Sequence, residues 1–282
     1  MTTAQLVFDL GFHRGEDTDH YLALGHRVVA VEANPNLAEQ GRERFAAAIS
    51  SRQLTLVHAA VLGEARTLSV VAFHPHPSRS EWGSVDLRWV QRNAEAHGLP
   101  HDAPLMVQAT TLQQLVAQFG TPWLLKIDIE GADEEVLADL AALEQKPAFV
   151  SWETGKESLA AVLNQHRRLR RLGYRRFRVV QQAYLERGPG VRLPNGTQYR
   201  FAVGSSGPTP ADSPKPWRSL SWVALHYRLL FVLYGLIGPR SWFAQASRSR
   251  HRWLAWGPKR IRAWADQQSL PFPGWVDSHA SL

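Results

Sequence analysis

Short apolar runs alternate with amphipathic stretches along the first 180 residues of the chain. The apolar runs, most of them stopped by glycine, acidic or proline residues, lie at residues 6–11, 26–33, 54–62, 68–74, 123–131 and 148–153. Stretches with helical periodicity follow at residues 17–24, 36–48, 85–97, 112–119, 132–143 and 157–172. Residues 174–180 and 198–203 have β character and predict an edge hairpin. This alternation predicts an α/β fold with a doubly wound, mainly parallel sheet.

Four of the predicted strands end in acidic residues. Right-handed crossovers bring the carboxyl ends of parallel strands to one rim of the sheet, where such folds bind ligands. The acids placed at this rim are Asp9, Glu32, Asp128, Glu130 and Glu153. Packing does not explain four acidic strand ends, so the sequence predicts a binding site there.

The sequence changes character after residue 204. Residues 205–216 are rich in glycine, serine and proline, which is typical of a loop or linker. An apolar stretch of 17 residues then covers 222–238, shorter than the roughly 20 residues needed to span a bilayer. We expect a helix packed on the domain, and an interfacial membrane helix stays open. The predicted organisation is a domain over 1–204 and a C-terminal extension over 217–282 that packs on or near the rim.

The net charge of +7 lies entirely in the last quarter of the chain. Residues 205–282 carry ten Lys and Arg against three Asp and Glu, together with seven of the eleven tryptophans, whereas residues 1–204 carry 22 of each charge. The chain has no cysteine, which excludes disulfides, Cys-ligated zinc and thiol catalysis and fits a cytoplasmic setting. Asp9 interrupts the early apolar run, so no signal peptide is expected.

The first loop combines glycines with acids. Its pattern is D-x-G-x-x-x-G, from Asp9 through Gly11 to Gly15, followed directly by Glu16 and Asp17. A dinucleotide fingerprint needs G-x-G-x-x-G, and a pyrophosphate would be repelled by these carboxylates. A ligand with a sulfonium and an ammonium group and no phosphate resolves the conflict. We therefore expect S-adenosylmethionine, held in part by Asp9, Gly11 and Gly15.

Glu32 ends the second predicted strand, about 20 residues after the glycine turn. An acid at this position accepts hydrogen bonds from both hydroxyls of an adenosyl ribose. NAD would use the same acid, so Glu32 predicts a bound ribose but does not identify the cofactor. The residues of the first loop distinguish the two cofactors.

Four stretches, "VFDLGFHRGEDT", "VVAVEANP", "TTLQQLV" and above all "LLKIDIEGADEEVL", resemble the FkbM family of S-adenosylmethionine-dependent methyltransferases. The likeness covers residues 6–155; "GSSGP" and the terminal "GWVDSHA" also look like elements of a bacterial branch of the family. The resemblance implies a class I methyltransferase fold, with a basic, Trp-rich helical extension here. It also implies methyl transfer to a hydroxyl oxygen of a sugar, glycan or polyketide-like metabolite.

The resemblance also implies roles for individual residues. Gly11 and Gly15 would line the methionine moiety and Glu32 the ribose. The adenine would lie near two small residues, Ala59 and Ala60. His13 and Arg14 depart from the small or amide residues usual in the family, and Arg14 is a candidate partner for the methionine carboxylate.

Methylation of an alcohol needs a base or a metal, because an alcohol is a poor nucleophile at neutral pH. Asp128 and Glu130 are two positions apart in an extended segment, so their carboxylates face the same way. Glu153 arrives from a neighbouring strand. Three nearby carboxylates either share a proton or hold a divalent cation. We favour an acid acting as base without a metal; Lys126 shares this face, and the competing interpretation of Glu130 is a residue favoured by a helix dipole.

Three further residues are candidates for binding the acceptor. Trp82 and Ser84 flank a glycine in a loop that suits stacking against a sugar. His279, with Asp277 two residues before it, would serve as a base or a substrate contact if the C-terminus folds over the rim.

The basic aromatic segment after residue 238 permits two other partners. An RNA-binding or RNA-modifying enzyme would use the cations for phosphates and the tryptophans for bases. A peripheral membrane protein would place them on an anionic lipid surface, near lipid-linked acceptors. The cations and tryptophans are Arg248, Arg250, Arg252, Lys259, Arg260, Arg262, Trp253, Trp256 and Trp264.

Overall fold

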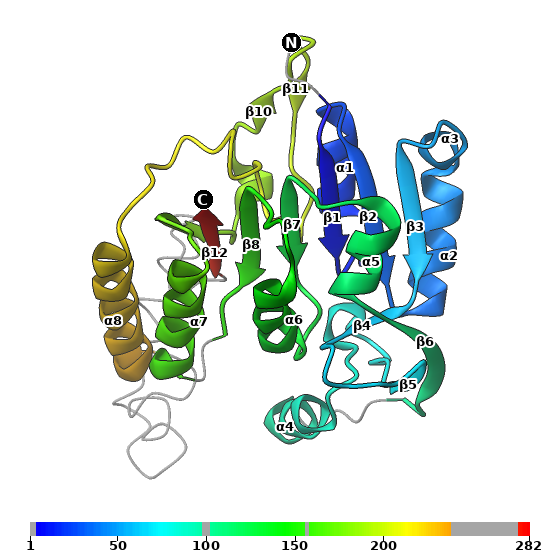
Figure 1. Cartoon of the computed structure of the whole chain (residues 1–282), viewed down its shortest axis with the longest axis horizontal. Helices are drawn as coiled ribbons and strands as arrows, with labels where there is room; N and C mark the ends of the chain where they lie inside the picture. Colours follow the sequence, from blue (N-terminus) through cyan, green and yellow to red (C-terminus); the bar gives the residue numbers. More distant parts are fainter. Residues whose placement is uncertain (1–3, 98–101, 156–157, 238–275) are drawn as a thin grey trace.

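The computed structural model describes residues 4–97, 102–155, 158–237 and 276–282. Its central sheet has seven strands in the order β3-β2-β1-β7-β8-β12-β9 (Figure 1). They are β1 (Leu6–Leu10), β2 (Arg27–Glu32), β3 (Leu54–His58), β7 (Leu124–Ile127), β8 (Phe149–Glu153), β9 (Arg176–Gln181) and β12 (Val276–Ser281). Neighbouring strands from β3 to β8 pair in parallel, whereas β12 is antiparallel to both of its neighbours. The predicted mainly parallel α/β sheet is confirmed.

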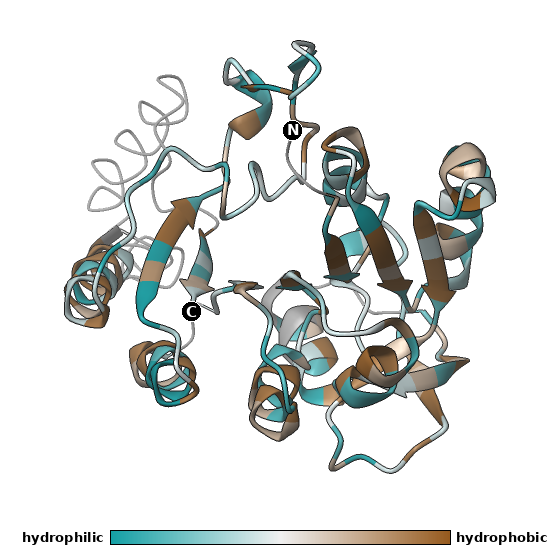
Figure 2. Cartoon of the chain, turned by 45° about the horizontal axis from the view of Figure 1, so that its top comes forward, coloured by the Kyte–Doolittle hydropathy of each residue, from teal (hydrophilic) through white to brown (hydrophobic). Residues whose placement is uncertain are grey.

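Helices cover both faces of this sheet. On one face α1 (Glu16–Ala23) and α3 (Ala46–Ser50) pack with α2 (Pro35–Arg44) beside them. The other face carries α5 (Leu112–Phe119), α6 (Asp133–Asp139), α7 (Leu159–Arg171) and α8 (Leu220–Ile237). Hydrophobic residues concentrate in the strands and along the sides of the helices (Figure 2), as expected for buried parallel strands between amphipathic helices.

Local sequence signals set where several helices begin. The side chain of Asn34 accepts a hydrogen bond from the backbone N–H of Asn36, and Pro35 occupies the first turn of α2, a favoured arrangement for a helix N-terminus. Thr111 and Gln114 form a capping box at the start of α5. The backbone N–H of Ala161 binds the Ser158 hydroxyl at the start of α7.

A smaller sheet lies beyond the carboxyl end of β3. It consists of β4 (Ala60–Leu62), β6 (Leu105–Thr111) and β5 (Val70–Phe73), and the chain between β5 and β6 contains α4 (Leu87–His97). Short 3-10 turns complete the described structure: η1 (Ser80–Trp82), η2 (Leu140–Ala142) and η3 (Leu185–Arg187).

The predicted edge hairpin between residues 174–180 and 198–203 does not form. β10 (Val191–Arg192) pairs instead with β11 (Gln198–Tyr199), while β9 pairs with the C-terminal strand β12. The two β-forming stretches were correctly recognised, but their partners were not, because strand pairing across nearly a hundred residues leaves no local signal.

The last residues of the described chain lie inside the sheet rather than over its rim. β12 is inserted between β8 and β9, and its Ser278 hydroxyl is bonded by Thr154 Oγ1 at 2.9 Å and by the Tyr227 hydroxyl at 2.6 Å. The prediction that residues 217–282 form a helical extension is therefore wrong for this strand. Its sequence, VDSHAS, is too polar to predict a central strand, although all six residues are buried.

The Gly/Ser/Pro-rich segment 205–216 contains no helix or strand, but it packs closely on the domain. The hydroxyl of Ser205 and the backbone N–H of Ser206 both donate to Asp17 Oδ1, at 2.8 and 2.7 Å. Arg178 donates to the carbonyl oxygen of Pro210 at 2.9 Å. The segment thus lies against α1 and β9 as part of the same domain.

The apolar stretch predicted over 222–238 forms α8 and packs on α7 and β9. Among the helices that the structure describes, none is long and apolar enough to cross a membrane. The outer side of α8 exposes large apolar side chains, including Leu225, Leu229 and Val232. An interfacial membrane role stays a prediction, and the basic aromatic residues 248–264 lie outside the described part of the chain.

Candidate active site

A cavity of about 590 Å³ lies at the carboxyl ends of β1, β2, β7 and β8. This is the rim predicted from the sequence, and the volume is typical of a pocket for a small ligand. Of the predicted site residues, those that line the cavity are Gly11, Glu32, Ala59, Ala60, Trp82, Ser84, Asp128, Glu130 and Glu153.

Gly11 holds two strand ends in close contact. Its φ of +94° is in the region that favours glycine, and a Cβ added there would lie 1.8 Å from the carbonyl oxygen of Asp128. The backbone N–H groups of Gly11 and Phe12 both donate to Val31 O at 3.0 Å. The turn therefore fixes the loop after β1 against the end of β7 while its backbone faces the cavity.

Gly15 has a different function from the one predicted. A Cβ at this position would lie 2.6 Å from ring atoms of Phe12 and Phe45, and Gly15 does not line the cavity. With φ of +81° it begins α1. It shapes the turn through packing, so a direct contact with the methionine moiety does not fit this position.

Asp9 also lies behind the cavity rather than in it. The carboxylate is fully buried, accepts a hydrogen bond from Thr18 Oγ1 at 2.6 Å and lies 3.5 Å from Lys126 Nζ. Burial raises its pKa to about 6, opposed mainly by the positive charge of Lys126. Direct contact with a ligand is not supported for Asp9; the acids that reach the wall from this loop are Glu16 and Asp17.

Lys126 links the first loop to the end of β7. Its Nζ lies 3.0 Å from Asp17 Oδ2 and 3.3 Å from Asp128 Oδ2, in addition to the Asp9 contact. The lysine is only 4% exposed, so these ion pairs are poorly screened. Its single charge orients three carboxylates, which is more than the neutralising role expected from the sequence.

Glu32 is held by backbone N–H groups on both carboxylate oxygens. His13 donates to Oε2 and Asn34 donates to Oε1, each at 2.7 Å. Burial raises the pKa of Glu32 to about 7, although these hydrogen bonds oppose the shift. Each oxygen keeps a further lone pair, so the fixed carboxylate can accept both hydroxyls of a ribose.

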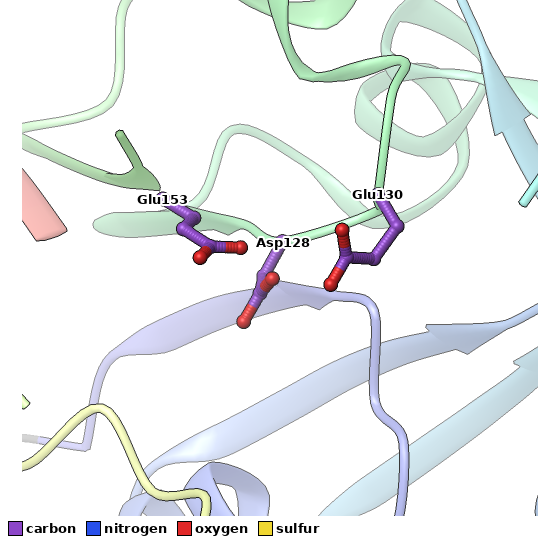
Figure 3. Close-up of side chains that lie close together, drawn as sticks. All are labelled: Asp128, Glu130 and Glu153. Atoms are coloured by element: carbon purple, nitrogen blue, oxygen red, sulfur yellow. The ribbon is translucent and has the colours of Figure 1, made fainter. Parts of the chain in front are cut away.

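Asp128, Glu130 and Glu153 converge at the cavity wall (Figure 3). One carboxylate oxygen from each lies within 4.8 Å of the others. The pKa of Glu130 is raised well above its ordinary value, first by burial and then by the charges of Glu153 and Asp128. The three carboxylates therefore lie together, as the sequence predicted.

The backbone at Glu130 is unusual. Its φ is +50° and that of Gly131 is +110°, and the hydroxyl of Ser84 donates to the Glu130 carbonyl oxygen. A non-glycine residue in this region is sparsely populated and is retained where neighbouring structure fixes it. Glu130 therefore lies in a loop whose backbone is fixed by its neighbours. It is not a helix N-terminal residue favoured by the helix dipole, since α6 begins at Asp133.

The family model described as "Methyltransferase FkbM domain" matches residues 9–176 of this chain. The chain belongs to the FkbM methyltransferase family. Its fold is that of class I methyltransferases, and its cofactor is S-adenosylmethionine.

Solved structures similar to this FkbM-family chain include methyltransferases. Precorrin-6y C5,15-methyltransferase from Geobacter metallireducens is 13% identical, with a TM-score of 0.35, over 64% of this chain and 69% of that one. An O-methyltransferase from Bacillus cereus in complex with SAH is 14% identical, with a TM-score of 0.31, over 64% and 68%. Dnmt2 from S. pombe is 13% identical, with a TM-score of 0.35, over 64% and 44%. A comparison with curated proteins finds no match, and none of these likenesses bears on the acceptor.

The cavity of the FkbM domain fits S-adenosylmethionine. Glu32 offers fixed acceptors for the ribose hydroxyls, and the small buried residues Ala59 and Ala60 leave room for a flat ring beside it. The negative charges of Glu16 and Asp17 at the wall suit the ammonium and sulfonium groups.

A second loop covers the glycine turn. His13 Nε2 lies 2.8 Å from Ser80 Oγ, and its Nδ1 lies 3.2 Å from Glu16 Oε1. Trp82 follows in the same loop and has the guanidinium of Arg79 5.0 Å from its ring centroid. The family departure at His13 thus has a structural role, because it connects the two loops. Arg14 lines the cavity, and its pairing with the methionine carboxylate stays a prediction.

Two predicted acceptor residues have other positions than expected. Ser84 is almost fully buried, and its hydroxyl points to the Glu130 carbonyl, so it positions Glu130. His279 is 2% exposed within β12, does not line the cavity, and has its pKa lowered to about 3 by burial. A substrate contact through His279 does not fit this place in the sheet.

Asp277, two residues before His279, has a position that the sequence did not predict. It lies directly opposite Glu153 in the β8–β12 ladder and is 2% exposed. The partnership could not be read from the sequence, because the two positions are 124 residues apart and β12 has no strand signal.

Proposed function

We propose that this FkbM-family enzyme transfers the methyl group of S-adenosylmethionine to a hydroxyl oxygen of a sugar, glycan or secondary metabolite. The supporting observation is the convergence of Asp128, Glu130 and Glu153 at the cavity wall. A neutral amine already has a nucleophilic lone pair, whereas an alcohol must lose a proton as it attacks. A set of carboxylates beside the donor pocket suits the second case.

Glu130 is the member best suited to take the proton. Burial and the charges of Glu153 and Asp128 raise the pKa of Glu130, which strengthens this carboxylate as a proton acceptor. The Lys126 ion pair orients Asp128, and Ser84 fixes the backbone of Glu130. S-adenosylmethionine would supply the methyl group and leave as S-adenosylhomocysteine, and a Glu130 carboxylate oxygen would accept the proton that the acceptor hydroxyl loses as its new C–O bond forms.

Trp82 supports a sugar or other flat acceptor. Its ring lines the cavity near the carboxylates and lies edge-on to His76, with ring centroids 5.1 Å apart. An indole face with a polar rim around it is typical of carbohydrate contacts, because it covers the apolar face of a pyranose. The acceptor would thus lie between Trp82 and Glu130.

A labelled-methyl assay tests this proposal. The protein is incubated with tritiated S-adenosylmethionine and, separately, with free sugars, glycosides, hydroxylated polyketides, primary amines and RNA. We expect base-stable label in one of the hydroxyl classes and none in the amines. Label confined to amines or to RNA would overturn the proposal.

The RNA arm also tests the alternative of an RNA-modifying enzyme. That alternative depends on residues 248–264, which lie outside the described part of the chain. Peripheral binding to an anionic membrane depends on the same residues together with α8, and flotation with acidic liposomes separates it from RNA binding.

A further inference from the structure

We propose that Asp128, Glu130 and Glu153, with Asp277 next to them, form a binding site for a divalent cation such as Mg²⁺ or Mn²⁺. This inference deepens the proposed function, on which its catalytic role rests. It adds a metal to the carboxylate base, which the sequence analysis favoured without a metal.

The spacing of the carboxylates fits an ion. One oxygen from each of the three cavity residues lies within 4.8 Å of the others. Oxygens on opposite sides of an Mg²⁺ ion lie about 4.2 Å apart, and around Ca²⁺ about 4.6–5.2 Å. An all-oxygen donor set selects Mg²⁺, Mn²⁺ or Ca²⁺ over softer metals.

Asp277 gives an independent indication of a missing partner. Its Oδ1 is buried and has no hydrogen-bond partner among the described residues. Because Asp277 and Glu153 are directly opposite in an antiparallel ladder, their side chains extend from the same face of the sheet. The unpaired oxygen therefore belongs to a side chain on the same face of the sheet as Glu153, from which it can bind a water on the ion.

Lys126 already pairs with three other carboxylates. Its Nζ is already within 3.5 Å of Asp9, Asp17 and Asp128. Buried carboxylates are retained when they are paired or bind metals. Burial of a fourth carboxylate, Asp277 on β12, would cost free energy unless a further cation offset its charge.

The ion would act on the acceptor. A hydroxyl bound to a divalent cation has a lower pKa, so the alkoxide forms more readily. Each carboxylate has two oxygens, and Glu130 can bind the ion through one and accept the acceptor proton through the other. The atoms and charges of the methyl transfer are otherwise those given above.

Mn²⁺ titration followed by electron paramagnetic resonance tests the site. The full-length protein is titrated without S-adenosylmethionine and without acceptor, so that Mn²⁺ is the one added ligand. We expect one saturable Mn²⁺ per chain at sub-millimolar concentration. Both Glu130→Gln and Asp277→Asn should weaken binding about 10–100-fold, a range typical of changes in and around metal ligands.

The matched control is Glu39→Gln, which removes one negative charge from an exposed pair with Arg42 and should leave Mn²⁺ affinity unchanged. Folding of each variant is checked by its thermal transition and by calorimetric binding of S-adenosylmethionine. If a folded wild-type chain shows no saturable site, or if Glu130→Gln and Asp277→Asn bind Mn²⁺ like wild type, the site is refuted.

The metal site and the proposed function fail separately. Methylation of an alcohol in the presence of a chelator would overturn the metal site and leave the function standing. Stoichiometric Mn²⁺ binding with label found only in amines or RNA would do the reverse.

Discussion

Gly11 and Asp128 touch across the end of the sheet: a Cβ at Gly11 would lie 1.8 Å from the Asp128 carbonyl oxygen. The loop after β1 and the segment after β7 that carries Asp128 and Glu130 are therefore in direct contact. A side chain at position 11 would push one of them away.

We expect Gly11→Ala to abolish detectable binding of S-adenosylmethionine by calorimetry. Gly25→Ala is the matched control, since Gly25 has φ of +84° with nothing within 4 Å of an added Cβ. That variant should lose about 1–2 kcal/mol of stability from backbone strain and keep its affinity. Equal affinities in both variants would show that the contact at Asp128 is unimportant.

Glu32 should make cofactor binding depend on pH. The ribose hydroxyls donate to the ionised carboxylate, and the pKa of Glu32 in the free protein is about 7. As the pH falls below about 7, the dissociation constant should rise about tenfold per unit. In Glu32→Gln, calorimetry at pH 5.5–8 should find weaker binding without this slope; a slope that persists in the variant would assign the proton to another group.

Removal of the buried cation should destabilise the fold. Lys126→Met leaves the Asp9, Asp17 and Asp128 carboxylates facing one another without their cation. Breaking a buried pair in this way typically lowers the free energy of unfolding by about 3–5 kcal/mol. Urea denaturation at pH 8 measures it. Arg42→Met breaks only the exposed pair with Glu39 and should change stability by less than about 1 kcal/mol; similar losses in the two variants would contradict the role given to Lys126.

His166 should make the stability of the fold decrease as the pH falls. It is buried among Trp152, Phe177 and Tyr227, and burial lowers its pKa to about 4. Below about pH 6.5 the unfolded chain binds a proton there that the folded chain does not, so the wild type loses stability as the pH falls toward 4. His166→Phe lacks this loss. The stability difference between wild type and variant should therefore shift by about 2 kcal/mol in favour of the variant between pH 7.5 and pH 5, and a constant difference in urea titrations would contradict it.

The sequence predicted the sheet, the rim and part of the cavity wall, because these depend on local patterns. Glu32, Asp128 and Glu153 were placed by the rule that parallel strands end on one side. Their placement needed only the recognition of each apolar run and of the acidic residue at its end.

The failures concern contacts between distant segments. Asp9 lies at a strand end, where a ligand contact is expected. Its carboxylate is instead bound by Lys126 and Thr18 behind the cavity. Gly15 is required by two phenylalanine rings rather than by a ligand. The largely polar composition of residues 276–281 is typical of an exposed segment. Their burial is explained by pairing with β8 and β9.

Methyl transfer by Glu130→Gln, measured beside its binding of S-adenosylmethionine, tests most directly whether the converging carboxylates do the chemistry. On the acceptor found in the labelled-methyl assay, we predict a 10²–10⁴-fold loss of kcat, as expected for removal of a general base. The dissociation constant for S-adenosylmethionine should change less than about threefold, since the glutamine keeps the loop and the Ser84 hydrogen bond to its backbone. A variant that transfers methyl groups at the wild-type rate would contradict the assignment of this site.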